Sequence, residues 1–205
     1  MKKLEIIIGT RPNFVKVTQF KSLAKQFDLD VVITHTGQHF DQNLSKVFFD
    51  EFKLYPDHFL DCLRERSQIN QIADIMSQLG ARFKKSQPDV VMVPGDVNST
   101  FAAAFVANRL GIPVAHLVSG LRSFDSNMPE EINRLVTDAI ADLLLTSCRD
   151  ADENLKREGV PEDRICFVGN VMIDSLVFNL ERSHRSTVLE DLGLAASTYT
   201  AVTLH

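Results

Sequence analysis

The sequence predicts an α/β fold, a Rossmann-like parallel sheet flanked by helices. Short apolar runs alternate with longer segments in which apolar residues recur at helical spacing. Strands that alternate with helices of this length imply right-handed crossovers and a parallel sheet. Polar residues directly follow most of the predicted strands, at the edge where such sheets bind ligands. The 205 residues suffice for one sizeable core.

The first half of the chain predicts strands over residues 4–8 and 30–36, while residues 57–63 fit either a strand or a loop. Pro12 suits the first turn of a helix. The apolar face of that helix is expected to comprise Val17, Phe20, Ala24 and Phe27. A further helix is expected over residues 42–52. The clearest helical stripe is formed by Ile69, Ile72, Ala73, Met76, Leu79 and Phe83.

The second half of the chain continues the alternation. Its predicted strands are residues 89–93, the run that carries His116, residues 143–146 and residues 165–168. Its predicted helices are residues 99–110, a helix that begins at Pro129, residues 150–157 and residues 171–180. Proline suits the first helical position, and acids in the first turn complement the helix dipole. Residues 181–191 suit a linker helix and residues 199–204 a further strand.

Composition and charge limit the classes of function. The net charge of −5 and the scattered basic residues argue against nucleic acid as a partner. No apolar run has the length of a membrane span, and the first residues lack a signal-peptide cleavage pattern, so we expect a cytoplasmic protein. Cys62, Cys148 and Cys166 are widely separated, which fits neither a disulfide framework nor a zinc site.

Polar residues at the expected carboxyl edge of the sheet predict a small-molecule site shared by several loops. They are Thr10, Arg11, Gln38, His39, Asp96, residues 119–122 and Asn170. The run GTRP from Gly9 combines a flexible residue, free amides at a helix start and a guanidinium, which together suit a phosphate group.

Each candidate also has a plain structural explanation. Arg11 fits a surface cation, and Gln38 and His39 fit a turn. Asp96 suits an Asx turn or a helix cap. His116 suits a hydrogen-bonded core residue. The acids after Pro129 suit a helix start, where each contributes roughly 0.3–1 kcal/mol.

Several segments resemble one enzyme family in the same order along the chain. They are GTRPNFVK from Gly9, THTGQHFD from Thr34, GDVNST from Gly95, HLVSGLRSFDSNMPEEINRLVTD from His116, residues 159–164 and VGNVMID from Val168. Over nearly its whole length the chain resembles the non-hydrolysing UDP-N-acetylglucosamine 2-epimerases. The resemblance implies the N-terminal half of a GT-B-type two-domain fold.

The resemblance also implies a reaction. The family interconverts UDP-GlcNAc and UDP-ManNAc for cell-surface polysaccharide synthesis: UDP and the C2 proton are lost to give a glycal, and UDP is then added back. No redox cofactor and no metal are expected. Asp96 and Glu130 are the implied catalytic acids. The implied substrate-binding residues are Arg11, Lys16, Gln38, His39, Gln71, His116, Arg122, Glu131, Arg134 and His205.

Val118 departs from the family pattern, which has glutamate at this position. Because residues two apart on a strand face the same side, we expect Val118 and His116 to point together into the cleft. Valine transfers no proton, and a general acid or base contributes roughly 10²–10⁴-fold to the rate. A catalytically impaired sugar-nucleotide binding or regulatory module is therefore one alternative function. Half of a GT-B glycosyltransferase is a weaker one.

The expected domain division places residues 1–180 in the N-terminal Rossmann-like domain. Residues 181–205 are expected to be a linker and the first strand of a C-terminal nucleotide-binding domain that this chain lacks. Without that domain we expect little epimerase activity from the chain alone. An uncovered β-rich edge invites association between chains, so a homodimer is an open alternative.

Overall fold

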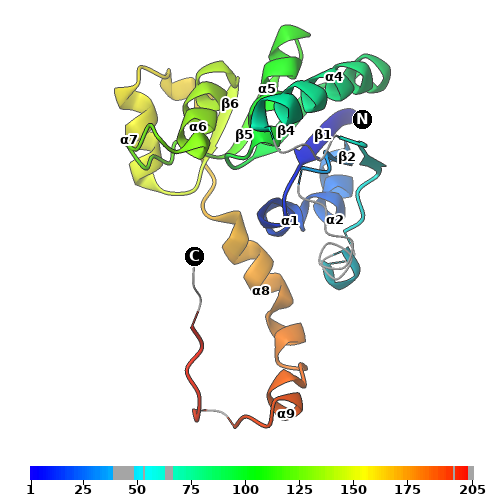
Figure 1. The fold of residues 1–205 in the computed structure, drawn as a ribbon, viewed down its shortest axis with the longest axis vertical. Coiled ribbons are helices and arrows are strands. Elements are labelled where there is room, and N and C mark those ends of the chain that lie inside the picture. The colour runs from blue at the N-terminus through cyan, green and yellow to red at the C-terminus, as the bar shows by residue number, and fades with distance from the viewer. Residues whose placement is uncertain (39–48, 53, 63–66, 196, 203–205) are drawn as a thin grey trace.

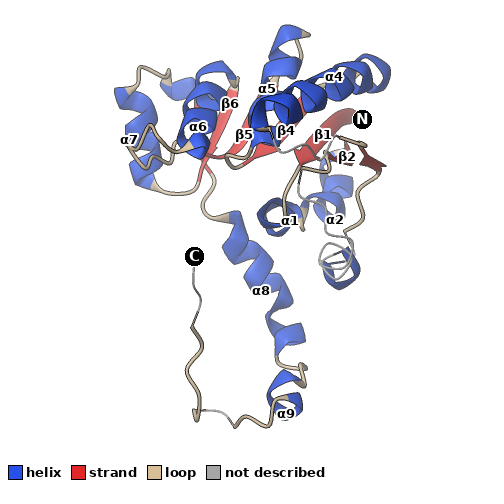
Figure 2. Cartoon of the chain, in the orientation of Figure 1, coloured by secondary structure: helices blue, strands red, loops and turns tan. Residues whose placement is uncertain are grey.

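A computed structural model describes residues 1–38, 49–52, 54–62, 67–195 and 197–202. These residues form a seven-stranded parallel sheet in the order β3-β2-β1-β4-β5-β6-β7 (Figures 1 and 2). The strands are β1 (Lys2–Ile8), β2 (Leu29–His35), β3 (His58–Phe59), β4 (Val90–Pro94), β5 (Val114–Ser119), β6 (Leu143–Thr146) and β7 (Ile165–Phe167). The predicted fold class is confirmed.

Helices cover both faces of the sheet. One face carries α4 (Gln68–Ser86), α5 (Asn98–Arg109), α6 (Pro129–Ile140) and α7 (Arg149–Arg157). The other face carries α1 (Arg11–Val17), α2 (Phe20–Ala24) and the start of α8 (Val171–Ser183) (Figure 1). Short helices η1 (Lys25–Phe27), η2 (Glu162–Arg164) and α9 (Val188–Asp191) complete the described elements. Residues 49–52, within the helix expected over 42–52, are helical.

The strand order reverses between β1 and β4, which makes their carboxyl ends the switch point of the sheet. Apolar residues of β1 pack on both faces, Ile6 and Ile8 on the α1 side and Ile7 on the α4 side. Glu5 is also fully buried, and its carboxylate accepts hydrogen bonds from Thr34, Ser86 and Arg82. The side chains of β1 are therefore packed or hydrogen-bonded within the protein. Residues available to a ligand lie in the loops beyond the end of the strand.

Three details of the sequence prediction are wrong. The helix expected after Pro12 is divided into α1, α2 and η1, so Phe27 is rotated out of the core and is 69% exposed. In the stripe predicted for α4, Ile69 at the first turn is 77% exposed and Ala73 is also exposed, whereas Ile75, which the stripe did not include, is fully buried. Residues 199–202 are irregular rather than a strand. They have no partner strand among the described residues, and an isolated strand does not satisfy its backbone groups.

The α8 helix leads away from the sheet, and α9 follows at its far end (Figure 1). Ser175 is the buried residue of α8; its hydroxyl lies 2.6 Å from that of Thr18. Large apolar side chains of α8 are exposed, including Ile173, Leu176, Val177 and Phe178. No helix among the described residues combines the length and apolar character needed to cross a membrane.

Candidate functional site

Asn13 fixes the loop between β1 and α1. Its side-chain oxygen accepts hydrogen bonds from the amides of Gly9 and Thr10, both at 3.1 Å. Its side-chain nitrogen donates to the carbonyl of Pro94, at the end of β4 (3.1 Å). One buried amide therefore joins the two loops that flank the switch point. Arg11 follows at the first position of α1, with an exposed side chain.

Four charged side chains of opposite signs meet above this switch point. The Asp96 carboxylate, 31% exposed, accepts from Nε (2.9 Å) and Nη2 (2.8 Å) of Arg134. Arg134 also pairs with Glu131, three residues earlier on α6. Burial lowers the pKa of Lys16; the negative charge of Asp96 opposes this shift and the positive charge of Arg134 adds to it. The two acids and two cations therefore form one electrostatic unit.

Glu131 anchors the loop that follows β5. Its carboxylate accepts the amide of Ser123 at 3.1 Å and that of Phe124 at 3.0 Å. Burial alone would raise the pKa of Glu131, but these two amides and Arg134 hold it below the ordinary value. Glu131 is 2% exposed and ionised, whereas Glu130 beside it is exposed and makes no hydrogen bond within the described part of the chain.

A string of amide side chains extends the site toward β2. The side-chain oxygen of Gln38 accepts from the amide (2.9 Å) and the hydroxyl (2.6 Å) of Ser99. Gln71 accepts from Asn98 at 3.2 Å, and Asn98 accepts from Asn133 at 3.2 Å. Asn133 also donates to the Asp96 carbonyl at 2.9 Å. Loops after β2 and β4 are thus tied to helices α4 and α6.

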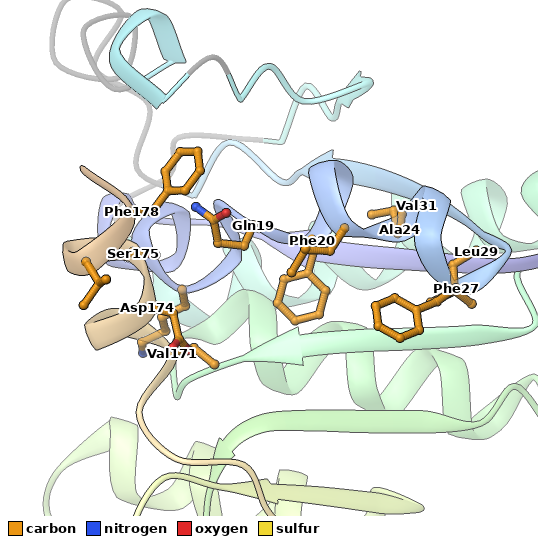
Figure 3. A pocket seen from close by; sticks show the side chains of 13 residues that line it. Gln19, Phe20, Ala24, Phe27, Leu29, Val31, Val171, Asp174, Ser175 and Phe178 are labelled. Atoms are coloured by element: carbon orange, nitrogen blue, oxygen red, sulfur yellow. The ribbon is translucent and has the colours of Figure 1, made fainter. Parts of the chain in front are cut away.

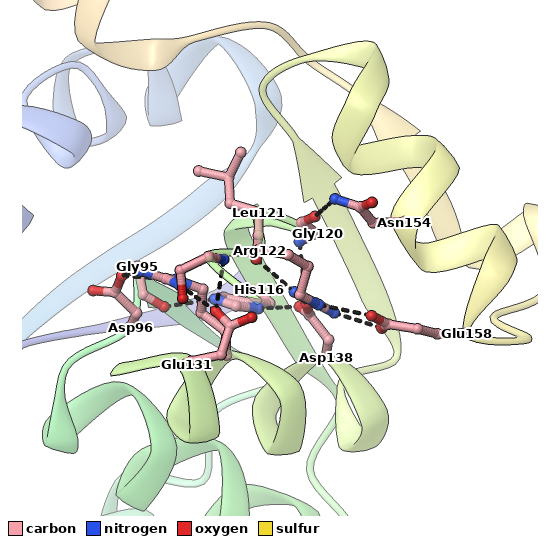
Figure 4. Close-up of polar contacts among 12 residues, drawn as sticks. Gly95, Asp96, His116, Gly120, Leu121, Arg122, Glu131, Asp138, Asn154 and Glu158 are labelled. Carbon is pink, nitrogen blue, oxygen red and sulfur yellow. Dashed lines mark hydrogen bonds and ion pairs between the residues drawn. The ribbon is translucent and has the colours of Figure 1, made fainter. Parts of the chain in front are cut away.

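His116 and Arg122 both bind Asp138, a buried acid on α6 (Figure 4). The Nδ1 atom of His116 lies 2.6 Å from one carboxylate oxygen, and Nη1 of Arg122 lies 2.8 Å from the other. Arg122 also donates two hydrogen bonds to Glu158, at 2.7 and 2.6 Å. Its side chain is 1% exposed, so in this conformation Arg122 stabilises the loop and does not face a ligand.

Most of the expected site residues converge at one edge. Lys16, Asp96, Glu131 and Arg134 contact or influence one another, and the string of amides links Gln38 and Gln71 to them. Arg11 and Glu130 lie at the first turns of α1 and α6. His116 and Arg122 lie below this edge in the Asp138 network. His39 and His205 are outside the described residues.

The prediction that His116 and Val118 face the same side is wrong. The pairing of β5 with β6 shifts register between Leu117 and Ser119, and Val118 has a φ of +68°. At this bulge the alternation of the strand is interrupted. Val118 is 8% exposed and packs with Leu117 in the cluster on the α1 face, whereas His116 faces α6. A β-branched residue rarely adopts this backbone conformation.

The sequence interpretation missed Asn13, Asn98, Asn133 and Asp138, which hold the site together. One signal was available for Asp138. It follows Glu131 by seven residues, so both acids lie on the same face of α6, and both are nearly fully buried. The asparagines had no comparable signal, because their partners lie far away in the sequence.

A cavity of about 620 Å³ lies between α1, α2 and α8 (Figure 3). Its walls are mostly apolar and include Phe20, Phe27 and Phe178. Lys16 is shared between this cavity and the charged site. No three His, Cys, Asp or Glu side chains in the described part of the chain lie close enough together to hold a metal ion.

Comparison with known proteins identifies the family. The model of the UDP-N-acetylglucosamine 2-epimerase family matches residues 21–205. The chain belongs to the UDP-N-acetylglucosamine 2-epimerase family. The epimerase of Methanocaldococcus jannaschii is 39% identical over 184 residues, which are 90% of this chain and 50% of that protein. UDP-2,3-diacetamido-2,3-dideoxy-D-glucuronate 2-epimerase of Pseudomonas aeruginosa is 39% identical over 208 residues, with 99% and 57% covered.

A solved epimerase has the same fold. The crystal structure of the M. jannaschii UDP-GlcNAc 2-epimerase in complex with UDP-GlcNAc and UDP superposes with a TM-score of 0.87 and 39% identity. The match covers 93% of this chain and 52% of that chain. The chain therefore spans about half the length of these epimerases, and its fold is that of their N-terminal half.

Proposed function

We propose that the chain is the N-terminal half of an enzyme that interconverts UDP-GlcNAc and UDP-ManNAc, for cell-surface polysaccharide synthesis. In this reaction UDP and the C2 proton leave the sugar, and both return with the configuration at C2 inverted. The observation that supports the proposal is the convergence of Lys16, Asp96, Glu131 and Arg134 at the switch point of the sheet. Family membership supports this chemistry for the group.

The charges divide naturally into two roles. Arg11, at the start of α1, and Lys16 bind the diphosphate, because helix-start amides and cations favour phosphate oxygens. Asp96 and Glu130 exchange protons with the sugar, since Asp96 is partly exposed and Glu130 is exposed. Arg134 orients Asp96, while Glu131 holds the loop over the site. Gln38 and Gln71 line the side of the site nearest β2.

The proposal includes a second, C-terminal domain that forms the opposite wall of the cleft, with His205 near its start. Relatives are about twice as long as this chain, which supports this arrangement. It also includes a cytoplasmic location, which suits three free cysteines, and a homodimer.

Deuterium incorporation tests this function. The protein expressed from its complete reading frame is incubated with UDP-GlcNAc in D₂O and followed by proton NMR. We expect loss of the C2 proton signal and formation of UDP-ManNAc. A protein that binds UDP-GlcNAc but leaves C2 unlabelled contradicts catalysis. UDP-2,3-diacetamido-2,3-dideoxy-D-glucuronate is tested in parallel. Deuterium incorporation into this compound alone contradicts UDP-GlcNAc as the substrate.

One observation favours a second candidate, a sugar-nucleotide binding module with impaired chemistry. Val118 is apolar, buried and turned away from His116, so it supplies no proton-transfer group. This candidate predicts saturable UDP-GlcNAc binding in calorimetry together with turnover far below that of the relatives. Turnover equal to that of the M. jannaschii epimerase contradicts it.

A further inference from the structure

The carboxylate of Asp138 connects two loops at the ligand-binding edge. One oxygen lies 2.6 Å from Nδ1 of His116. The other accepts the amide of Gly120 at 3.1 Å and lies 2.8 Å from Nη1 of Arg122. The Nε2 atom of His116 is 2.7 Å from the carbonyl oxygen of Gly95. A single buried acid thus reaches the loop after β5 directly and the loop after β4 through His116 (Figure 4).

These partners define where the protons lie. A carbonyl oxygen only accepts hydrogen bonds, so Nε2 of His116 carries a proton. Burial alone would raise the pKa of Asp138, but the hydrogen bond and charge of His116, together with Arg122, hold it below the ordinary value. The Nδ1 atom of His116 therefore faces a carboxylate whose ionised form is stabilised by its surroundings. The imidazole ring of His116 is held between the Asp138 carboxylate and the Gly95 carbonyl oxygen.

The Gly95 peptide sets the direction of the next residue, Asp96. Gly95 has a φ of +72°, and a Cβ atom there would lie 2.8 Å from Nζ of Lys16. The peptide is therefore held by His116 through its carbonyl and closely approached by Lys16. A rotation of this peptide moves the Asp96 carboxylate relative to Arg134.

We propose that Asp138 is a positioning residue: through His116 it fixes the Gly95 carbonyl and so aims Asp96 at the reacting sugar. The catalytic meaning of this role rests on the proposed epimerase function. Asp138 itself is 1% exposed, so it acts through its neighbours. Small misplacements of a reacting group cost on the order of 100-fold in rate, so the effect belongs in kcat rather than in KM.

Two substitutions of Asp138 distinguish the loss of its hydrogen bonds from the loss of its negative charge. Asp138→Ala removes both connections, and we expect kcat for UDP-GlcNAc to fall about 100-fold while KM stays within about threefold. Asp138→Asn keeps an oxygen for Gly120 and Arg122 and turns its NH₂ toward Nδ1 of His116. The ring then keeps its Nε2 proton and the bond to Gly95. We expect kcat at least tenfold above that of Asp138→Ala.

The matched control is Asp152→Asn. Asp152 is another largely buried carboxylate at the same edge, bonded to Thr146 and Arg149 and not connected to His116. It is expected to alter stability but to leave kcat within about twofold. Equal losses in Asp138→Ala and Asp138→Asn overturn the proposal, as does a rise in KM with unchanged kcat.

A readout independent of turnover completes the test and remains usable if Asp138→Ala fails to fold. In ¹⁵N NMR of the complete protein, Nε2 of His116 is expected to be protonated in both the wild type and Asp138→Asn. A wild-type ring without a proton on Nε2 overturns the proposal. If wild-type protein leaves C2 unlabelled but gives the expected spectra, the epimerase function fails and the positioning of Gly95 stands.

Discussion

His116 and Val118 lie two residues apart on β5 and face opposite sides of the sheet. The register shift at Leu117 and the positive φ of Val118 cause this separation. His116 is committed to the Asp138 network under α6, while Val118 fills part of the apolar cluster against α1 and α8. The position at which the family has an acid therefore contributes packing in this chain.

The second candidate, a module with impaired chemistry, predicts that Val118→Glu raises kcat of the complete protein by about 100-fold or more, because an added general acid or base contributes roughly 10²–10⁴-fold. Deuterium exchange at C2 of UDP-GlcNAc measures the effect. Val118→Gln is the matched control: it has nearly the same size but transfers no proton, and it is expected to give no gain. Equal rates for the two variants would show that side-chain size, not proton transfer, matters at this position.

Glu130 and Glu131 are adjacent, but their substitutions are expected to affect protein stability differently. Glu131→Gln weakens the contacts with the amides of Ser123 and Phe124, so we expect a loss of about 1–3 kcal/mol in the free energy of unfolding. Glu130→Gln changes an exposed side chain that makes no hydrogen bond among the described residues, and stability is expected to stay within about 1 kcal/mol, the helix-dipole contribution of a first-turn acid. Urea denaturation measures both.

Turnover provides the complementary readout for the same pair. Glu130→Gln is expected to lower kcat by roughly 10²–10⁴-fold, as for loss of a general acid or base. An unchanged kcat in Glu130→Gln would remove this residue from the proposed proton transfer.

Gly120→Ala is expected to destabilise the chain far more than Gly111→Ala. Both glycines have positive φ values, +77° and +71°. A Cβ at Gly120 would lie 2.6 Å from the carbonyl oxygen of Ala151 on α7, whereas a Cβ at Gly111 meets nothing within 4 Å. Gly111→Ala therefore carries the backbone cost alone, about 1–2 kcal/mol, and Gly120→Ala adds the displacement of α7. Equal losses in thermal denaturation would contradict the close approach.

His35 makes the stability of the fold sensitive to acid. Burial lowers the pKa of His35 from 6.5 to about 4. Between these values the unfolded chain binds the extra proton, so the free energy of unfolding decreases as pH falls. We expect a loss of about 2 kcal/mol between pH 7.5 and pH 5 from this residue.

Urea denaturation at the two pH values tests this expectation with two variants. His35→Asn removes the titrating ring and should reduce the pH dependence by about the same 2 kcal/mol. His184→Asn, at an exposed histidine, should leave it unchanged. A pH dependence that survives in His35→Asn would assign the acid sensitivity to other groups.

The sheet and its ligand-binding edge were predictable because they follow from local periodicity. Strands such as residues 4–8 and 143–146 are short, predominantly apolar runs, and the polar residues that follow them mark the carboxyl edge. The packing of individual side chains was less predictable. Phe27 and Ile69 fit a helical stripe but lie where the packed helix has ended or barely begun.

The hydrogen bonds that connect the site could not be predicted from local sequence patterns. Asn13 reaches Pro94, 81 residues away, and His116 reaches Asp138, 22 residues away. The bulge at Val118 has no glycine to indicate a positive φ, so period-two alternation gave the wrong face. The strand expected over 199–204 failed in its described part for another reason: β-rich composition does not provide a neighbouring strand.

The central pairing of β1 with β4 has a kinetic consequence. Lys3 and Asp89 are hydrogen-bonded across a separation of 86 residues, so a long chain segment must be enclosed before the middle of the sheet exists. Closing such a loop is entropically unfavourable, and contacts of this range slow folding. Asn13 joins the carboxyl ends of the same two strands, so the ligand-binding edge is assembled only after this long segment has closed.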